Sequence, residues 1–268
     1  MSQKLGEIEV LKQWRLMQVG YAGAGKTTAA TTFGKRLDGW VRTYVFDLEN
    51  KMDAAIDYWK HESKEDYEAA MDLIERDIYM DGDASSPTAI NNLEAKIGEL
   101  RDNCPYDLII FDSLTGLEIV MMNQILRTRP SEGRTYFKIG DRKKQIPVLP
   151  DYGVLVSHME RIVIEMVAID ATIIVNSHVK RTQNKKTSIM YTGPLVVGDV
   201  LPGKLPGWFN EVHFLWNELD KDGERVYLRR TRPHEELNFL RTSMRKIDDV
   251  IPQEYRYLEE YYLAAGGK

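Results

Sequence analysis

Hydrophobic positions along the chain form short apolar runs that alternate with longer segments of helical spacing. Runs this short, rich in Val, Ile and aromatic residues, are typical of buried strands. The four strongest runs cover residues 14–19, 41–48, 107–114 and 171–178, and a weaker run covers 76–81. Strands that alternate with helices predict an α/β fold with a mainly parallel central sheet flanked by helices.

The segments between these runs predict the helices. Ser86 is placed to cap a helix that begins near Pro87 and ends at Leu100. The other predicted helices run from the glycine-rich loop after the first strand to about Leu37, over 53–75 and over 151–168.

The pattern changes near residue 193, where glycine and proline become frequent. Two more strand candidates, 209–216 and 224–231, are joined around Asp222 and Gly223, which predicts an antiparallel C-terminal extension. No linker interrupts the chain. We therefore expect residues 14–268 to form a single domain, preceded by an N-terminal segment, residues 1–13, that could contact a neighbouring protomer.

The glycine-rich loop reads GYAGAGKT and fits the phosphate-binding pattern G-x-x-x-x-G-K-[ST]. Glycines let backbone N–H groups approach phosphate oxygens, and the following helix N-terminus adds partial positive charge. We expect Lys26 to neutralise the β- and γ-phosphates and Thr27 to bind Mg²⁺. The predicted nucleotide-binding residues are Gly20, Gly23, Ala24, Gly25, Lys26, Thr27 and Thr28.

Asp112, at the end of the most apolar strand, is the second chemical signal. A carboxylate there can hold the metal beside the phosphates, so Asp112 is predicted to bind metal together with Thr27. The segment Asn50-Lys51-Met52-Asp53 matches the guanine-reading pattern of GTPases, but it begins only 24 residues past Lys26. We interpret that match as coincidence, because in GTPases the pattern follows the metal-binding acid.

Composition excludes several classes of protein. The chain has 268 residues, of which 43% are hydrophobic and 29% charged, and Cys104 is its one cysteine. A single cysteine rules out an internal disulfide framework and a cysteine-rich zinc site. The N-terminus lacks the apolar stretch of a secretory signal, and no apolar run reaches 18 residues, so we expect a cytoplasmic protein with no membrane partner.

The net charge is −5, but the charges are segregated along the sequence. Residues 49–83 hold twelve acids against four Lys or Arg, whereas residues 127–144 hold seven bases against two acids. Residues 179–192 hold four bases and no acid. Such segregation can create an anion-binding surface on an acidic protein, and two solvated loops are the alternative.

The motifs follow one another in a defined order. The phosphate-binding loop precedes FDLEN at 46–50, FDSLTGL at 111–117 and NSHVKR at 176–181. In this order and spacing the chain resembles the RecA-like recombination ATPases, and most of all their core-only relatives in bacteriophages, which include single-strand annealing proteins. The resemblance covers about residues 14–245. It implies a RecA-like P-loop fold, ATP and Mg²⁺, and assembly with itself as a ring or filament.

The resemblance also implies catalytic roles beside those of Lys26 and Asp112. Glu49, on a strand expected beside the P-loop, falls where the family has the glutamate that activates the attacking water. Asn176, Ser177 and His178 fall where the family has a residue that senses the γ-phosphate. RecA has Asn-Gln there and this chain has Asn-Ser-His, so His178 is favoured as the sensor, with a structural histidine as the alternative.

The two DNA-binding loops of the family fall on the two basic segments. This agreement favours single-stranded DNA as a partner, because basic groups can follow phosphates while an aromatic ring stacks on a base. An anchoring role for Tyr136 and Phe137 within their own loop is the alternative. The predicted DNA-binding residues are Arg127, Arg129, Arg134, Tyr136, Phe137, Lys138, Arg142, Lys143, Lys144, Lys180, Arg181, Lys185 and Lys186.

RecA-like sites usually lie between protomers, with a basic finger from the neighbour. Arg230, Arg232 and Arg241 are the candidates, and a salt-bridged edge strand or a further DNA contact are the alternatives. Tyrosines at the C-terminus lie on a short predicted helix and are expected to pack against the core or another subunit. They are Tyr255, Tyr257, Tyr261 and Tyr262.

The sequence therefore predicts a Mg²⁺-dependent ATPase that binds single-stranded DNA during recombination or annealing as an oligomer. It would act with phage or host replication and recombination proteins, in the host cytoplasm if the chain is phage-encoded. A helicase-like ring motor and a nucleotide-dependent switch or scaffold for a protein partner stay open. A small-molecule kinase is a weaker alternative.

Overall fold

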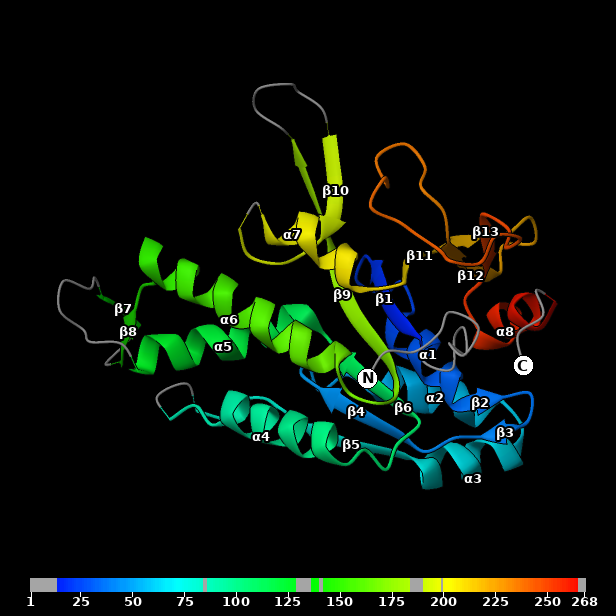
Figure 1. The fold of residues 1–268 in the computed structure, drawn as a ribbon, viewed down its shortest axis with the longest axis horizontal. Coiled ribbons are helices and arrows are strands. Elements are labelled where there is room, and N and C mark those ends of the chain that lie inside the picture. Colours follow the sequence, from blue (N-terminus) through cyan, green and yellow to red (C-terminus); the bar gives the residue numbers. More distant parts are fainter. Residues whose placement is uncertain are drawn as a thin grey trace, which may run out of the picture.

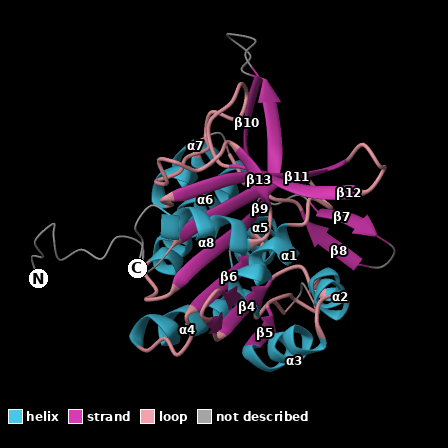
Figure 2. Ribbon diagram, turned by 90° about the vertical axis from the view of Figure 1, so that its right-hand side faces the viewer, coloured by secondary structure: helices cyan, strands magenta, loops and turns pink. Residues whose placement is uncertain are grey.

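The computed structural model describes residues 14–83, 86–128, 136–139, 142–183, 190–198 and 200–264. Its centre is a large sheet with helices on both faces (Figures 1 and 2). Six parallel strands lie in the order β11 (Glu211–Leu219), β1 (Arg15–Gly20), β9 (Thr172–Gln183), β6 (Leu108–Asp112), β4 (Thr43–Asp47) and β5 (Ile74–Ile78).

Antiparallel strands complete the sheet at its C-terminal side. β12 (Arg225–Arg230) and β13 (Val250–Pro252) continue it beyond β11. β10 (Met190–Pro194) pairs with the outer part of β9, which runs well past the edge of the sheet. These strands confirm the predicted fold class, a mainly parallel sheet with an antiparallel C-terminal extension.

Two hydrophobic clusters hold the helices against the two faces. On one face, α4 (Ala89–Asp102), α5 (Leu114–Thr128) and α6 (Leu149–Val167) pack on the sheet. On the other face lie α1 (Lys26–Thr31), α2 (Asp53–His61) and α8 (Tyr255–Ala264). The central strands are buried on both faces, which is why their sequences are almost continuously apolar.

Smaller elements lie around this core. They are α3 (Lys64–Leu73), α7 (Leu201–Lys204), the 3₁₀ turns η2 (Thr32–Gly34) and η3 (Leu205–Trp208), and the hairpins β2 (Lys35–Arg36) with β3 (Gly39–Trp40) and β7 (Tyr136–Ile139) with β8 (Arg142–Gln145). The hairpin β7–β8 occupies part of the first basic segment, which the sequence analysis treats as a loop.

The helix after the P-loop is shorter than predicted. It ends at Thr31 rather than near Leu37, because the hydroxyls of Thr31 and Thr32 donate to the carbonyls of Thr28 and Ala29. Threonine side chains that bond to helix carbonyls compete with continued helix, and Gly34 then leads into an extended strand.

Three further boundaries differ from the prediction. The helix expected over 53–75 is two helices, since Ser63 caps α3 by accepting a bond from the Asp66 amide. Ser86 does not cap α4; the Asp81 carboxylate accepts from the amides of Thr88 and Ala89 at 3.0 Å each. The weak strand begins at Ile74, not at residue 76.

Candidate functional site

A cavity of about 540 Å³ opens at the carboxyl ends of the central parallel strands. Its size suits a small-molecule ligand. The lining residues are Ala22, Gly23, Ala24, Gly25, Lys26, Thr27, Thr28, Ala29, Thr32, Glu49, Lys51, Ala54, Asp57, Tyr58, Asp112, His178, Tyr227, Gln253 and Glu254. The structure therefore brings the predicted P-loop residues from Gly23 to Thr28 to one cavity with Glu49, Asp112 and His178, whereas Gly20 is not among the lining residues.

Two glycines of the loop are there because the backbone leaves no room for a side chain. A Cβ on Gly20 would lie 2.4 Å from the Leu215 carbonyl oxygen. Gly25 has φ +85°, and its Cβ would lie 2.7 Å from the Gln253 side-chain oxygen and 2.8 Å from the Tyr227 ring. Gly25 is the residue immediately before α1, so this tight fit aligns the loop with the helix N-terminus.

Lys26 spans the loop. Its ammonium donates to the carbonyl oxygens of Gly20 at 2.9 Å and Tyr21 at 2.8 Å, and it lies 3.4 Å from His178 Nδ1. Burial lowers the pKa of Lys26 to about 8, against the opposing charges of Asp112 and Glu49. A buried cation held by neutral carbonyls gains further stabilisation from an anionic ligand.

Thr27 and Asp112 meet beneath the loop. The Thr27 hydroxyl donates to Asp112 Oδ2 at 2.5 Å, and burial of the carboxyl raises the pKa of Asp112. A hydroxyl and a carboxylate are hard oxygen donors, and Mg²⁺ in phosphate sites takes one or two protein ligands together with waters and phosphates. The donor set present here fits Mg²⁺.

Glu49 follows β4, the strand beside β6, and lies close to Ser113, the residue after Asp112. Its Oε1 accepts from the Ser113 hydroxyl and lies 3.5 Å from His178 Nε2, while its Oε2 lies 2.6 Å from the Lys51 ammonium. The bond from His178, followed by those from Lys51 and Ser113, holds the pKa of Glu49 well below its usual range. Glu49 is therefore an ionised, oriented acceptor.

The expectation that Glu49 follows the strand beside the P-loop is wrong. β9 and β6 lie between β1 and β4. Glu49 reaches the cavity because Asp47, at the end of β4, folds the next residues back: its Oδ1 accepts from the amides of Glu49 at 3.2 Å and Asn50 at 2.6 Å. Gly116 on α5 supports this turn from below, since a Cβ there would lie 2.5 Å from the Leu48 carbonyl oxygen.

Among the three sensor candidates only His178 lines the cavity. Asn176 and Ser177 are fully buried within β9, and the Ser177 hydroxyl donates to the carbonyl of His178 at 2.9 Å. His178 contacts both Lys26 and Glu49, so one imidazole connects the P-loop lysine with the Glu49 carboxylate.

The C-terminal extension supplies part of the cavity wall, which no sequence motif predicts. Gln253 Nε2 donates to the carbonyls of Ala24 at 2.8 Å and of Trp216 and Leu228 at 2.9 Å, which ties the P-loop to β11 and β12. Tyr227 and Glu254 line the cavity beside it. These residues lie about two hundred positions from the P-loop and match no motif, so no local signal indicates them.

A buried arginine supports this wall. Arg229 on β12 is fully buried; its guanidinium donates to the Gln253 carbonyl and lies 5.6 Å from the Phe33 ring centre. The adjacent residue, Arg230, is one of the arginines predicted to act as a finger in a neighbouring protomer's site, whereas the sequence predicts no role for Arg229. Only the alternation of the strand distinguishes the two, because successive side chains point to opposite faces.

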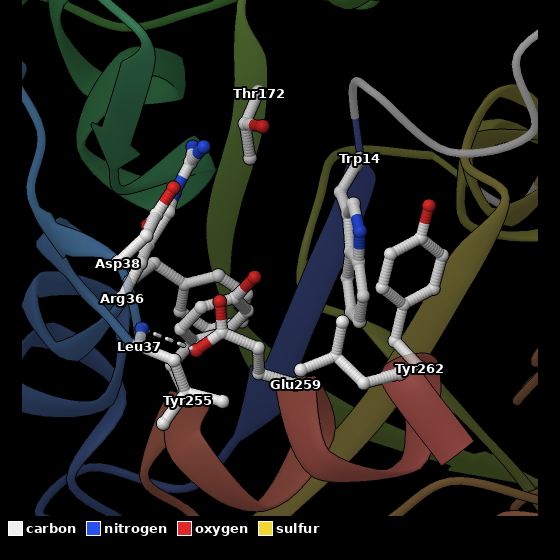
Figure 3. Close-up of a pocket in the computed structure, with 10 residues that line it drawn as sticks. Trp14, Arg36, Leu37, Asp38, Thr172, Tyr255, Glu259 and Tyr262 are labelled. Carbon is white, nitrogen blue, oxygen red and sulfur yellow. Dashed lines mark hydrogen bonds between the residues drawn. The ribbon is translucent and has the colours of Figure 1, made fainter. Parts of the chain in front are cut away.

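A second cavity, of about 250 Å³, lies at the opposite, amino ends of the strands (Figure 3). Trp14, Tyr255 and Tyr262 surround it, and the Glu259 carboxylate accepts from the Leu37 amide at 2.9 Å. This carboxylate is committed to a backbone contact that fixes α8 against the β2–β3 hairpin. The tyrosine helix therefore packs against the core, as the sequence predicts for Tyr255 and Tyr262.

The described parts of the two basic segments lie at separate places in the molecule (Figures 1 and 2). The hairpin β7–β8 lies beyond the ends of α5 and α6, and the β9–β10 arm extends the sheet strand that carries His178. Arg129, Arg134, Lys185 and Lys186 lie outside the described residues, as do the side chains of Phe137, Lys138, Arg142, Lys143 and Lys144.

The described side chains of these segments have different surroundings. Arg127 and Tyr136 are exposed, and the Tyr136 hydroxyl accepts from Gln145 Nε2 at 3.3 Å. Lys180 is half-buried. Arg181 donates to both carboxylate oxygens of Glu236, at 2.8 and 2.6 Å, so an arriving phosphate would compete with that ion pair.

The candidate finger arginines lie away from the cavity within the described part of the chain. Arg230 lies 6.0 Å from the Trp216 ring centre, and Arg232 donates to the Arg245 carbonyl at 2.6 Å. Arg241 exchanges backbone hydrogen bonds with Val212, and its side chain is exposed.

Comparison with known proteins gives the family of this chain. Within the described residues no helix is long and apolar enough to cross a bilayer. No curated protein matches the chain. The family model described as an AAA domain matches residues 12–237, a range that holds the P-loop, Glu49, Asp112 and His178. The chain therefore belongs to this AAA domain family of P-loop ATPases.

Proposed function

We propose that this AAA domain hydrolyses ATP with Mg²⁺, and that it is a RecA-like ATPase that acts on single-stranded DNA in recombination or annealing as an oligomer. The observation that carries the ATPase proposal is the convergence of Lys26, Glu49, Asp112 and His178 in one cavity. These residues come from α1, the turn after β4, the end of β6 and the middle of β9, so their meeting depends on the whole sheet.

Each residue has a defined task in this reaction. Lys26 exchanges its two loop carbonyls for phosphate oxygens, and the P-loop amides bind the β-phosphate. Thr27 and Asp112 would hold Mg²⁺, which when bound neutralises charge on the β- and γ-phosphates. Glu49 orients the attacking water and accepts its proton, and general-base catalysis of this kind contributes 10²–10⁴-fold.

The far half of the cavity suits the nucleoside. Tyr58 and Asp57 lie on α2, and Tyr227 lies on β12. Aromatic faces can stack on a base, and a carboxylate can accept from ribose hydroxyls or an exocyclic amine.

The DNA part of the proposal is supported by charge and by continuity of the chain. His178 contacts the phosphate-binding lysine, and Lys180 and Arg181 follow it on the same strand, β9, which continues into the basic arm. A change at the γ-phosphate that moves His178 thus acts on the arm directly. The trans finger from Arg230, Arg232 or Arg241 belongs to the same proposal, because completion from a neighbour needs an assembly.

ATP turnover with and without single-stranded DNA tests both parts. Wild-type protein should hydrolyse ATP, Lys26→Ala should not, and DNA should stimulate turnover. Four to six phosphate contacts predict that log affinity falls with log salt at a slope of about −3 to −4. Replacing Lys143 and Lys144 by Ala should lower that slope by about one unit or more.

Lys221→Ala, on the exposed β11–β12 turn, is the matched control and should leave the slope unchanged. Hydrolysis that depends on Lys26 without any DNA binding at low salt would reject the recombination role and favour a nucleotide switch for a protein partner. Absence of hydrolysis would reject the ATPase proposal itself.

A further inference from the structure

Lys51 is a second lysine in the nucleotide cavity, and no motif assigns it a role. Its ammonium lies 2.6 Å from Glu49 Oε2, yet its side chain is 68% exposed, whereas that of Glu49 is 15% exposed. The pair therefore joins a fixed carboxylate to a cation that can move within the cavity. A surface ion pair of this kind contributes little to stability, so its position needs another explanation.

The turn that carries Lys51 is built to hold it there. The Asp47 carboxylate fixes the amides of Glu49 and Asn50, and Arg76 Nη1 lies 3.1 Å from its other oxygen. Asn50 has φ +52°, a left-handed conformation that asparagine tolerates better than most residues. Lys51 follows directly, and Met52 beyond it is buried. The backbone on both sides of Lys51 is thus anchored, and only its side chain is free to swing.

The charges of the cavity explain what this cation can do. Around Glu49 lie the cations Lys26 and Lys51, the imidazole of His178 and the carboxyl of Asp112. Lys26 donates to the P-loop carbonyls, whereas Lys51 pairs with Glu49, the carboxylate proposed to hold the attacking water. The finger arginines do not line the cavity in the described part of this chain. Within one protomer, Lys51 is therefore the group available to meet charge on that side of the γ-phosphate.

We propose that Lys51 is a catalytic residue supplied in cis, whose ammonium bridges Glu49 and the γ-phosphate and neutralises charge on the phosphoryl group during transfer. This inference rests on the proposed ATPase function. In the step, the water oxygen bonds to the γ-phosphorus, the bond to the β-phosphate oxygen breaks, and the water proton passes to Glu49. Lys51 transfers no proton, and its bond to Glu49 raises the pKa of Lys51, which keeps the ammonium charged.

Differential binding separates this role from a structural one, because a catalytic contact is stronger in the transition state than in the ground state. Lys51→Ala should lower kcat at least tenfold and weaken binding of ADP with aluminium fluoride, a mimic of the transferring phosphoryl group, by a similar factor. Affinity for a non-hydrolysable ATP analogue should change less than about threefold. Lys51→Arg should recover most of the activity, since it keeps the charge.

Lys60→Ala, on the exposed surface of α2, is the matched control and should behave as wild type. Unchanged or increased turnover of Lys51→Ala would overturn the inference, and so would equal weakening of both nucleotide complexes. If wild-type protein hydrolyses ATP and Lys26→Ala does not, such a result counts against Lys51 alone. If the wild type does not hydrolyse ATP, the proposed function fails, and the catalytic role of Lys51 fails with it.

Discussion

Two of the carboxylates that line the cavity, Asp112 and Glu49, come from the ends of the neighbouring strands β6 and β4, and their surroundings shift their pKa values in opposite directions. Asp112 is buried at the end of β6, where the Thr27 hydroxyl is its main partner and burial raises its pKa. Glu49 receives bonds from His178, Lys51 and Ser113, which hold its pKa low. Pairs of acids whose environments separate their pKa values usually have different tasks in one reaction.

The difference shows which carboxylate would gain most from a positively charged ligand. Within the described part of the chain, Asp112 has no salt-bridge partner, so a bound cation would supply what burial removes. Glu49 already has the Lys51 ammonium at 2.6 Å and stays ionised without any ligand. The Asp112 site beneath the P-loop therefore suits a metal, and the Glu49 site suits a proton acceptor held beside water.

The largest expected effect tests the proposed role of Glu49 as the general base. Glu49→Gln keeps the geometry but removes the base, so ATP should bind with near-normal affinity while turnover falls 10²–10⁴-fold. Single-turnover hydrolysis and nucleotide titration measure the two quantities separately. A fall in turnover of less than about threefold would show that Glu49 is not the base.

A smaller effect tests the proposed metal site at Thr27 and Asp112. Thr27→Ala removes a hydroxyl oxygen and the bond to Asp112, so the Mg²⁺ concentration for half-maximal turnover should rise about 10–100-fold, as for the loss of other groups that orient a ligand. Thr27→Ser keeps the hydroxyl and should retain the wild-type Mg²⁺ dependence. Equal Mg²⁺ curves for all three proteins would place the metal elsewhere.

The smallest expected effect concerns the stability of the nucleotide-free protein, and its sign should differ between Glu49 and Asp112. A lowered pKa means that ionised Glu49 stabilises the fold above its unfolded pKa, and that this contribution is lost as pH falls through the lower folded value. A raised pKa means that Asp112 contributes below its unfolded pKa, and that this is lost as pH rises through the higher folded value.

At pH 7, Glu49→Gln should therefore destabilise the protein and Asp112→Asn should stabilise it, each by about 1 kcal/mol. Urea unfolding at pH 5 and pH 8 measures the change, and the gain from Asp112→Asn should be larger at pH 8. Changes of the same sign in the free energy of unfolding of both variants would show that the surroundings of Glu49 and Asp112 do not differ as described.

Much of the site could be predicted from the sequence because it follows strand ends. Gly20, Asp112 and His178 each end an apolar run within the sheet, and parallel strands bring such residues to one edge. The residue spacing of α5 was also readable, since Leu117, Met121 and Ile125 repeat at four-residue intervals and are all buried. The predicted elements nevertheless leave the residues between the strand at 107–114 and the basic segment at 127–144 unassigned.

Contacts between distant segments were out of reach. Asp81 caps α4 from seven and eight residues away, and Gln253 supports the P-loop from more than two hundred. Neither position belongs to a local pattern. The pairing of Arg181 with Glu236 is of the same kind, and neither the charge pattern nor the family resemblance predicts this ion pair.

The sequence by itself determined the fold class, the P-loop and the identity of the acids at the strand ends, because backbone periodicity and the chemistry of phosphate binding are local. Only the tertiary structure decided the strand order that separates β4 from β1, the turn that returns Glu49 and Lys51 to the cavity, and the C-terminal wall behind Gly25. These depend on how the sheet assembles, since burial and opposing charges set a side chain's task only once distant segments meet.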